Sequence, residues 1–127
     1  MVIVQDRSLR KASGGRNTST KTKRLAQAGN NPSLTAIGSK RTRTRRVRGG
    51  NSRTGLLSAE MVNLLDPKSG KLTRAKLKEV KESQANRNYI RRNILTKGTV
   101  VTTDKGEAII TNRPGQEDTI NAVLVTK

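Results

Sequence analysis

The hydrophobic positions divide the chain at about residue 54. Before that point the apolar residues stand singly among Ser, Thr, Asn, Gly and basic side chains, apart from Val2-Ile3-Val4. After it they gather in short runs separated by turn-forming residues. This pattern predicts a small aliphatic core in the C-terminal part and an extended N-terminal part that is disordered on its own.

The first turn signal in the C-terminal part is Asp66-Pro67-Lys68-Ser69-Gly70, with Pro at the second position and Gly where a left-handed residue is needed. It separates residues 60–65 from residues 72–82. The second of these segments is ambiguous, because its Lys and Glu content suits a helix while its apolar spacing fits neither period. A strand is favoured there, since the neighbouring segments read as strands.

Two further turns continue the pattern. Asp104-Lys105-Gly106 is expected to join residues 99–103 and 107–111 as a hairpin with β-branched flanks. Arg113-Pro114-Gly115-Gln116 matches a type II turn, with Pro and then Gly at its centre, and leads to a last strand at residues 119–125. Many short strands without a long helical pattern predict a mostly β fold, a small barrel of short antiparallel strands or a sandwich.

Arginines alternate along residues 41–48, which predicts a basic strand. Arg41, Arg43 and Arg45 would share one face, with Arg46 and Arg48 on the other. Side chains on one face of a strand are about 6.6 Å apart, close to the spacing of successive phosphates. Residues 49–51 (Gly-Gly-Asn) supply a turn, and residues 53–58 can return as a second strand. A charge run is often only a solvated face, but the absence of nearby acids favours a phosphate-binding ribbon.

The charge balance strengthens this interpretation. The 127 residues carry 27 Lys and Arg against 9 Asp and Glu, a formal charge of +18. Residues 1–53 hold 14 of the basic residues and a single acid, Asp6. Such a polycation repels itself and needs a polyanion, and nucleic acid provides one. We therefore expect a basic tail at residues 1–40, disordered without RNA and with at most one short helix around residues 21–28, and an RNA-binding barrel at residues 41–127.

Composition also excludes several functions. The absence of Cys and His removes disulfides, thiolate sites, the commonest general base and the commonest zinc ligand. No apolar run approaches the roughly 20 residues of a transmembrane helix, and the first seven residues do not read as a signal peptide. The sequence predicts a cytoplasmic protein that is not an enzyme and has no metal, cofactor, membrane or small-molecule substrate.

A second basic segment lies at residues 85–93, where Arg and Asn alternate around Tyr89. Arg can contact phosphate or guanine, and Asn can pair with adenine. Tyr89 either stacks on an unpaired base or is a core aromatic whose hydroxyl reaches the surface. Lys97 beside Gly98 either contacts phosphate or belongs to a hairpin turn, and Gly49 and Gly50 either approach phosphate or make a turn. The candidate RNA-binding residues are Arg7, Arg10, Lys11, Arg16, Arg41, Arg43, Arg45, Arg46, Arg48, Gly49, Gly50, Asn51, Arg53, Asn86, Arg87, Asn88, Tyr89, Arg91, Arg92 and Lys97.

Several blocks together resemble one family of small-ribosomal-subunit proteins shared by archaea and eukaryotes, the family numbered eight-e. The Arg-rich Gly-Gly-Asn signature and the Asn-Arg-Asn-Tyr-Ile-Arg-Arg-Asn block are the most specific. The chain departs from the family pattern at residues 23–30. The matching stretches are residues 6–8, 10–11, 14–16, 44–51, 53, 85–98, 113–116 and 121–124.

The resemblance implies a β-barrel with a basic extension threaded through small-subunit ribosomal RNA, ribosomal proteins as neighbours and no catalysis. The leading hypothesis is thus a structural constituent of the small ribosomal subunit. An architectural, chromatin-type DNA-binding protein is the alternative, disfavoured by the scarcity of exposed apolar wedges. An RNA-processing enzyme would need an acid–base pair, which the sequence does not offer.

Overall fold

The computed structural model describes residues 3–4, 8–18 and 24–125, and the chain divides into two compact units, residues 1–32 and 33–127. In the first unit β1 (Ile3–Val4) pairs antiparallel with β2 (Ala28–Gly29). The helix expected around residues 21–28 is a single 3-10 turn, Leu25–Gln27, within the described part. Residues 21–23 lie outside that part, and disorder of the tail without RNA stays a prediction.

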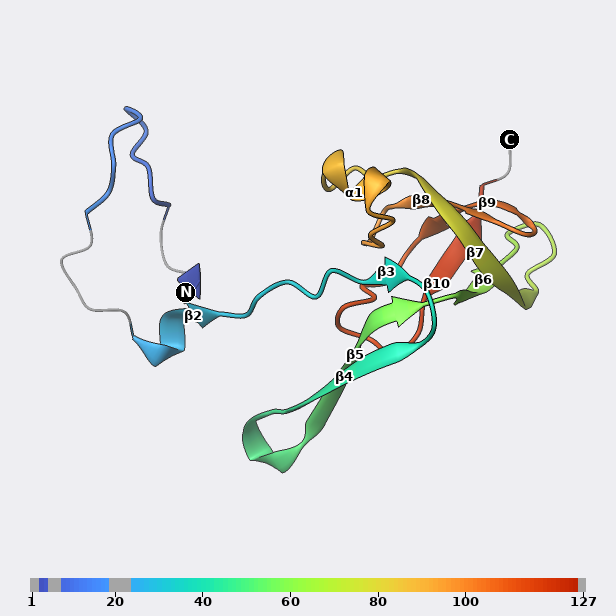
Figure 1. Ribbon diagram of the computed structural model, residues 1–127, viewed down its shortest axis with the longest axis horizontal. Coiled ribbons are helices and arrows are strands. Elements are labelled where there is room, and N and C mark those ends of the chain that lie inside the picture. Colours follow the sequence, from blue (N-terminus) through green and yellow to red (C-terminus); the bar gives the residue numbers. More distant parts are fainter. Residues whose placement is uncertain (1–2, 5–7, 19–23, 126–127) are drawn as a thin grey trace. The chain divides into compact units, whose positions relative to one another are not determined.

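The second unit contains a closed barrel, which confirms the expected fold (Figure 1). The strand order is β10-β6-β7-β8-β9, and all pairs are antiparallel except β10 with β6. Five strands that alternate in direction leave the first and last running the same way, so closure requires one parallel pair. The strands are β6 (Met61–Leu65), β7 (Leu72–Glu82), β8 (Val100–Thr103), β9 (Gly106–Ile110) and β10 (Asn121–Leu124).

A smaller sheet precedes the barrel in the chain. It has the order β3-β5-β4, in which β3 (Ala36–Ile37) runs parallel to β5 (Ser52–Ala59) and β4 (Arg41–Arg46) runs antiparallel to it. In Figure 1, β4 and β5 extend from the barrel as a two-stranded ribbon whose far end is the 3-10 turn Arg48–Gly50. The predicted basic hairpin is therefore present.

The strand assignment of residues 72–82 is confirmed, and the structure explains its broken apolar period. Ala75, Leu77 and Val80 are all buried although the last step spans three residues. The pairing of β7 with β8 shifts register between Leu77 and Glu79 and again between Val80 and Glu82. An extra residue at a bulge moves the inward face along the strand by one position, so strict alternation fails.

The core is aliphatic, as the absence of Phe and Trp requires. Its members come from β5, all five barrel strands and the segments between them. Ile90 of the short helix α1 (Asn88–Arg91) packs against it. The largest fully buried apolar side chains are Leu56, Val62, Leu64, Leu95, Val101, Ile110 and Ile120.

The turns at residues 66–70 and 104–106 form as predicted, with Gly70 at φ 66° and Gly106 at φ 131°. The type II assignment at residues 113–116 is wrong. The amide of Gln116 does donate to the carbonyl of Arg113 at 2.9 Å, but Gly115 lacks the positive φ of a type II turn. Gly115 is instead close to another segment of the chain, since a Cβ there would lie 3.1 Å from Cβ of Ser33.

Candidate nucleic-acid interface

The β4–β5 ribbon presents arginines on both faces. Arg45 lies directly opposite Arg53, and Arg43 lies opposite Gly55, so Arg43, Arg45 and Arg53 share one face. Arg46 lies opposite Ser52 on the other face. All of these guanidinium-bearing residues are exposed except Arg45, which is half-buried. The pairing thus brings together on one face three arginines that come from two strands.

The first strand of the ribbon ends two residues earlier than the sequence indicated. β4 stops at Arg46, because the amide of Val47 donates to the carbonyl of Asn51 at 2.8 Å and closes the tip. Arg48 therefore lies in the tip and not on the opposite face of the strand, which corrects the prediction. Gly49 and Gly50 both have φ 80°, a conformation that favours glycine. The turn-forming role of these glycines is confirmed, and their approach to phosphate stays a prediction.

The arginines of the ribbon have no carboxylate within ion-pair distance anywhere in residues 3–4, 8–18 and 24–125. The ion pairs of the described residues all use lysines. Lys40 lies 3.1 Å from Asp118, Lys76 lies 3.7 Å from Glu60 and Lys78 lies 3.4 Å from Asp104. Lys81 pairs with Glu107. The positive charge of the ribbon is thus left uncompensated, whereas Lys76, Lys78 and Lys81 on the barrel strand β7 each have a carboxylate partner.

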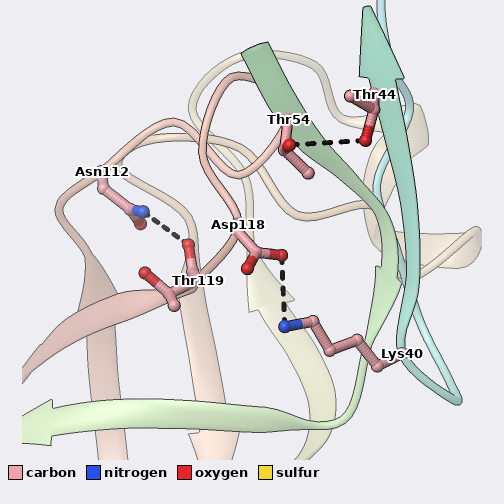
Figure 2. Close-up of polar contacts among 6 residues, drawn as sticks. All are labelled: Lys40, Thr44, Thr54, Asn112, Asp118 and Thr119. Carbon is pink, nitrogen blue, oxygen red and sulfur yellow. Dashed lines mark hydrogen bonds and ion pairs between the residues drawn. The ribbon is translucent and has the colours of Figure 1, made fainter. Parts of the chain in front are cut away.

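The root of the ribbon is fixed to the barrel side by polar contacts. Figure 2 shows Lys40, just before β4, reaching Asp118, and the hydroxyls of Thr44 and Thr54 facing each other across the strands at 3.4 Å. On β5, the amide of Leu56 donates to the carbonyls of Pro114 at 2.9 Å and Glu117 at 3.1 Å. The bonds of Leu56 and Lys40 thus join the root of the ribbon to the segment before β10, whereas the Thr44–Thr54 contact joins the two strands of the ribbon to each other.

The Asn112–Asp118 loop that receives the ribbon is itself tied down. The side-chain amide of Asn112 donates to the carbonyl of Thr119 at 2.7 Å (Figure 2). The side-chain oxygen of Asn112 accepts from the backbone amide of Asn121 at 3.0 Å. The side chain at the start of the loop is thus bonded to the backbone at its end, which closes the loop that contacts the root of the ribbon.

The second basic segment surrounds the helical turn α1. Arg87, Arg91 and Arg92 are exposed, and Tyr89 is half-buried. This half-burial is compatible with both alternatives for Tyr89, base stacking and a core aromatic whose hydroxyl reaches the surface, and both stay predictions. In Figure 1, α1 lies at the opposite end of this unit from the ribbon tip, so the two candidate patches are separate.

The asparagines of this segment have local structural partners. Oδ1 of Asn86 accepts the amide of Asn88 at 2.9 Å, and Oδ1 of Asn93, which has φ 49°, accepts the amide of Val80 at 3.2 Å. Lys97 is exposed beside Gly98, which has φ 83°, in the turn before β8. The turn role of Gly98 is confirmed, and the RNA contacts of these residues stay predictions.

In the first unit, Arg10 and Arg16 face each other as an isolated β-bridge. The guanidinium of Arg10 donates to the carbonyl of Gly14 at 2.9 Å, so part of its hydrogen-bonding capacity is used within its own loop. Lys11 and Arg16 are exposed or half-exposed around this loop. Arg7 lies outside the described residues.

Sequence reasoning missed the residues that position the ribbon. Thr35 is fully buried, and its hydroxyl donates to the carbonyl of Leu56 at 2.7 Å. Gly55 lies against the backbone of Gly115. A glycine inside a strand is a signal of close backbone approach, so Gly55 could have been noticed, whereas nothing local distinguishes Thr35.

Within the described ranges, no three Asp or Glu side chains gather closely enough to hold a metal ion. Nor does any helix in these ranges have the length and apolar character needed to cross a membrane.

Comparison with known proteins identifies the family to which the sequence is similar. The sequence model of the family described as Ribosomal protein S8e matches residues 4–125. The chain is 46% identical over 124 residues to the small ribosomal subunit protein eS8 of Methanocorpusculum labreanum, covering 98% of this chain and 99% of that one.

Two further relatives carry the same name. The protein of Methanocella arvoryzae is 47% identical over 121 residues, covering 95% of this chain and 97% of the relative. That of Picrophilus torridus is 42% identical over 125 residues, covering 98% of this chain and 100% of the relative. Matches of this extent span both the tail and the barrel, and the chain belongs to the ribosomal protein S8e family.

Proposed function

We propose that this protein is a structural constituent of the small ribosomal subunit that binds and stabilises small-subunit ribosomal RNA. The observation that carries the proposal is the ribbon, which places Arg43, Arg45 and Arg53 on one face without a carboxylate near any of them in the described residues. Membership of the ribosomal protein S8e family supports a place in the ribosome, which we infer to be cytoplasmic.

The direct opposition of Arg45 and Arg53 is informative because like charges in cross-strand positions destabilise a sheet. The pairing of these two arginines therefore does not stabilise the free protein. A phosphate backbone lying along that face would neutralise both guanidinium groups and release condensed counterions. Arginine also offers bidentate hydrogen bonds to phosphate, which lysine does not. The ribbon is therefore suited to track one RNA strand.

The patch around α1 would make a second, separate contact. Arg87, Arg91 and Arg92 surround the half-buried Tyr89, whose ring can stack on an unpaired base. Contacts at two distant points, with the tail ordering on RNA as a third, would fix RNA segments relative to one another. That is the role of a structural protein and involves no reaction.

Co-sedimentation with small ribosomal subunits at about 0.5 M salt tests the proposal, because loose charge contacts are screened there. We expect the full chain to stay with the subunits in a one-to-one ratio. A variant with Arg43→Gln, Arg45→Gln and Arg53→Gln should be lost to the supernatant. The matched control carries Lys76→Gln, Lys78→Gln and Lys81→Gln, which removes equal charge from ion-paired positions and should be retained.

Loss of the unaltered chain from the subunits, with recovery on chromosomal DNA, would instead favour the DNA-binding alternative. Equal retention of the two triple variants would contradict the role given to the ribbon.

A further inference from the structure

The outer surface of the barrel carries a set of aliphatic side chains that lie in register. Leu65 of β6 is paired with Val123 of β10, and Val123 is paired with Ile109 of β9. Leu72 of β7 lies opposite Leu65, and Val125 follows Val123 by two residues. Neighbouring strands are about 4.8 Å apart, so these five residues, here called the apolar row, form one continuous patch.

These side chains point away from the core. Ile109 is 40% exposed although Ala108 and Ile110, on either side of it, are fully buried. Leu72 is 74% exposed and Val125 is 39% exposed. Single exposed aliphatic residues are ordinary, but a contiguous row of them marks an interaction surface.

The chemistry around the row does not suit nucleic acid. Strands β6, β8, β9 and β10 contain no Lys or Arg, although the chain carries a charge of +18. Beside the row, the amide of Asn63 donates to Asn121 at 3.1 Å, and the hydroxyl of Thr111 donates to the carbonyl of Asn121 at 3.2 Å. On β9, Glu107 lies two residues before Ile109 on the same face and pairs with Lys81. The row therefore offers a phosphate backbone little counter-charge.

The β7 end of the row is bordered by the cation Arg74, which indicates the chemistry of the partner. Arg74 follows Leu72 by two residues on the exposed side of β7 and lies opposite Asn63. No carboxylate of the described part of the chain lies within ion-pair distance of it. A partner segment with aliphatic side chains and one carboxylate would therefore be complementary to the row and to Arg74.

We propose that the apolar row and Arg74 bind a second protein through a segment that presents aliphatic side chains and a carboxylate. The strands of the barrel are paired all round, so the partner engages side chains and does not add a strand to an open edge. A second copy of this chain is disfavoured as the partner, because two molecules of charge +18 repel each other. This proposal does not rest on RNA binding by the ribbon, which belongs to a different sheet.

Photo-cross-linking in cells that express the full chain tests the proposal. Leu72 is replaced by p-benzoylphenylalanine, the cells are irradiated, and adducts are purified under denaturing conditions and identified by mass. We expect an adduct with another protein, joined at a peptide that contains aliphatic residues and Asp or Glu. Ile109, replaced in the same way, should give an adduct with the same protein.

A charge variant makes the test specific. Arg74→Gln should lower the yield of the protein adduct about tenfold, while the matched change Lys105→Gln, in the turn between β8 and β9, should leave it unchanged. Adducts with RNA or with a second copy of the chain would overturn the proposal. So would the absence of adducts at both positions, or a yield of the protein adduct that Arg74→Gln does not change. Because adducts are read in whole cells, the result is independent of whether the chain is retained in small subunits.

Discussion

A Cβ atom on Gly55 would lie 2.3 Å from the carbonyl oxygen of Gly115. The two glycines let the backbone of β5 and the backbone of the 113–116 turn meet at the root of the arginine ribbon. Gly115 in turn lies against Ser33 on its other side, where a Cβ would come 3.2 Å from the carbonyl oxygen of Ser33. Three segments that are distant in sequence are thus in backbone contact at the point from which the ribbon extends.

Gly55→Ala should destabilise the protein by about 1–3 kcal/mol, because a side chain forced into a filled space displaces its neighbours. The obstacle here is backbone and not the end of a flexible side chain, so relief is difficult. Urea unfolding of the full chain measures the loss. Gly15→Ala, in the first unit where the nearest atom would be 3.8 Å away, is the control and should change stability by less than about 0.5 kcal/mol. Equal effects of the two changes would contradict the proposed contact.

Thr35 connects the segment before β3 to the root of the same ribbon. Its buried hydroxyl donates to the carbonyl of Leu56 at 2.7 Å. Thr35→Val keeps the shape but leaves that carbonyl without this donor, so we expect a loss of about 1–3 kcal/mol in the free energy of unfolding. Thr102→Val is the matched control, because the Thr102 hydroxyl has no hydrogen bond to another described residue. If Thr35→Val leaves the free energy of unfolding unchanged, the hydrogen bond from Thr35 to Leu56 does not contribute to stability.

The pairing of Arg45 with Arg53 predicts opposite effects on stability and binding. Arg53→Thr removes a like-charge cross-strand pair and adds a β-branched residue, so it should stabilise the free protein by about 0.2–1 kcal/mol at low salt. The same change should weaken binding to small-subunit ribosomal RNA. Urea unfolding and filter binding measure the two quantities. The stability gain should shrink in high salt, and a variant that is less stable at low salt would show that the pair is not repulsive.

The ribbon could be predicted because its signals are local. Alternating arginines followed by Gly-Gly-Asn are enough to indicate a basic hairpin, and the residues at 72–82 were assigned to a strand from the character of their neighbours. The bulges in that strand could not be predicted, because they depend on its register with β8. Which basic residues form ion pairs could not be predicted either, because the partners are distant in sequence. Lys40 and Asp118, for example, meet only in the folded chain.

Where sequence reasoning failed, a long-range contact determined the local conformation. The Pro114-Gly115 pair predicts a type II turn, in which the glycine has a positive φ. Gly115 does not have a positive φ, and its lack of a side chain instead allows a close approach to Ser33. The alternation of arginines suggested that Arg48 continues the strand, but the bond between Val47 and Asn51 closes the tip first.

Asp66 makes the turn between β6 and β7 sensitive to pH. The hydroxyl of Ser69 and the backbone amide of Lys68 donate to its carboxylate, at 2.8 and 3.0 Å, and hold the pKa of Asp66 below its ordinary value. Because the folded-state pKa is depressed, the stabilisation is present above the unfolded-state pKa and is lost as the pH falls through the folded-state pKa. NMR titration of the Asp66 carboxyl should show the low value, and Ser69→Ala should raise it. If Ser69→Ala leaves the pKa of Asp66 unchanged, the assignment of this hydrogen bond as the cause is wrong.

The salt dependence of RNA binding tests the phosphate mechanism directly. If about 6–10 phosphates are contacted, the association constant should fall by about 10³–10⁵ between 50 and 200 mM salt, because bound counterions are released on binding. The variant with Arg43→Gln, Arg45→Gln and Arg53→Gln should show a slope of log K against log salt that is smaller by about two to three. The control with Lys76→Gln, Lys78→Gln and Lys81→Gln should keep the original slope, since those lysines already have carboxylate partners. A slope near zero for the unaltered chain would mean that its charge is not used on a phosphate backbone.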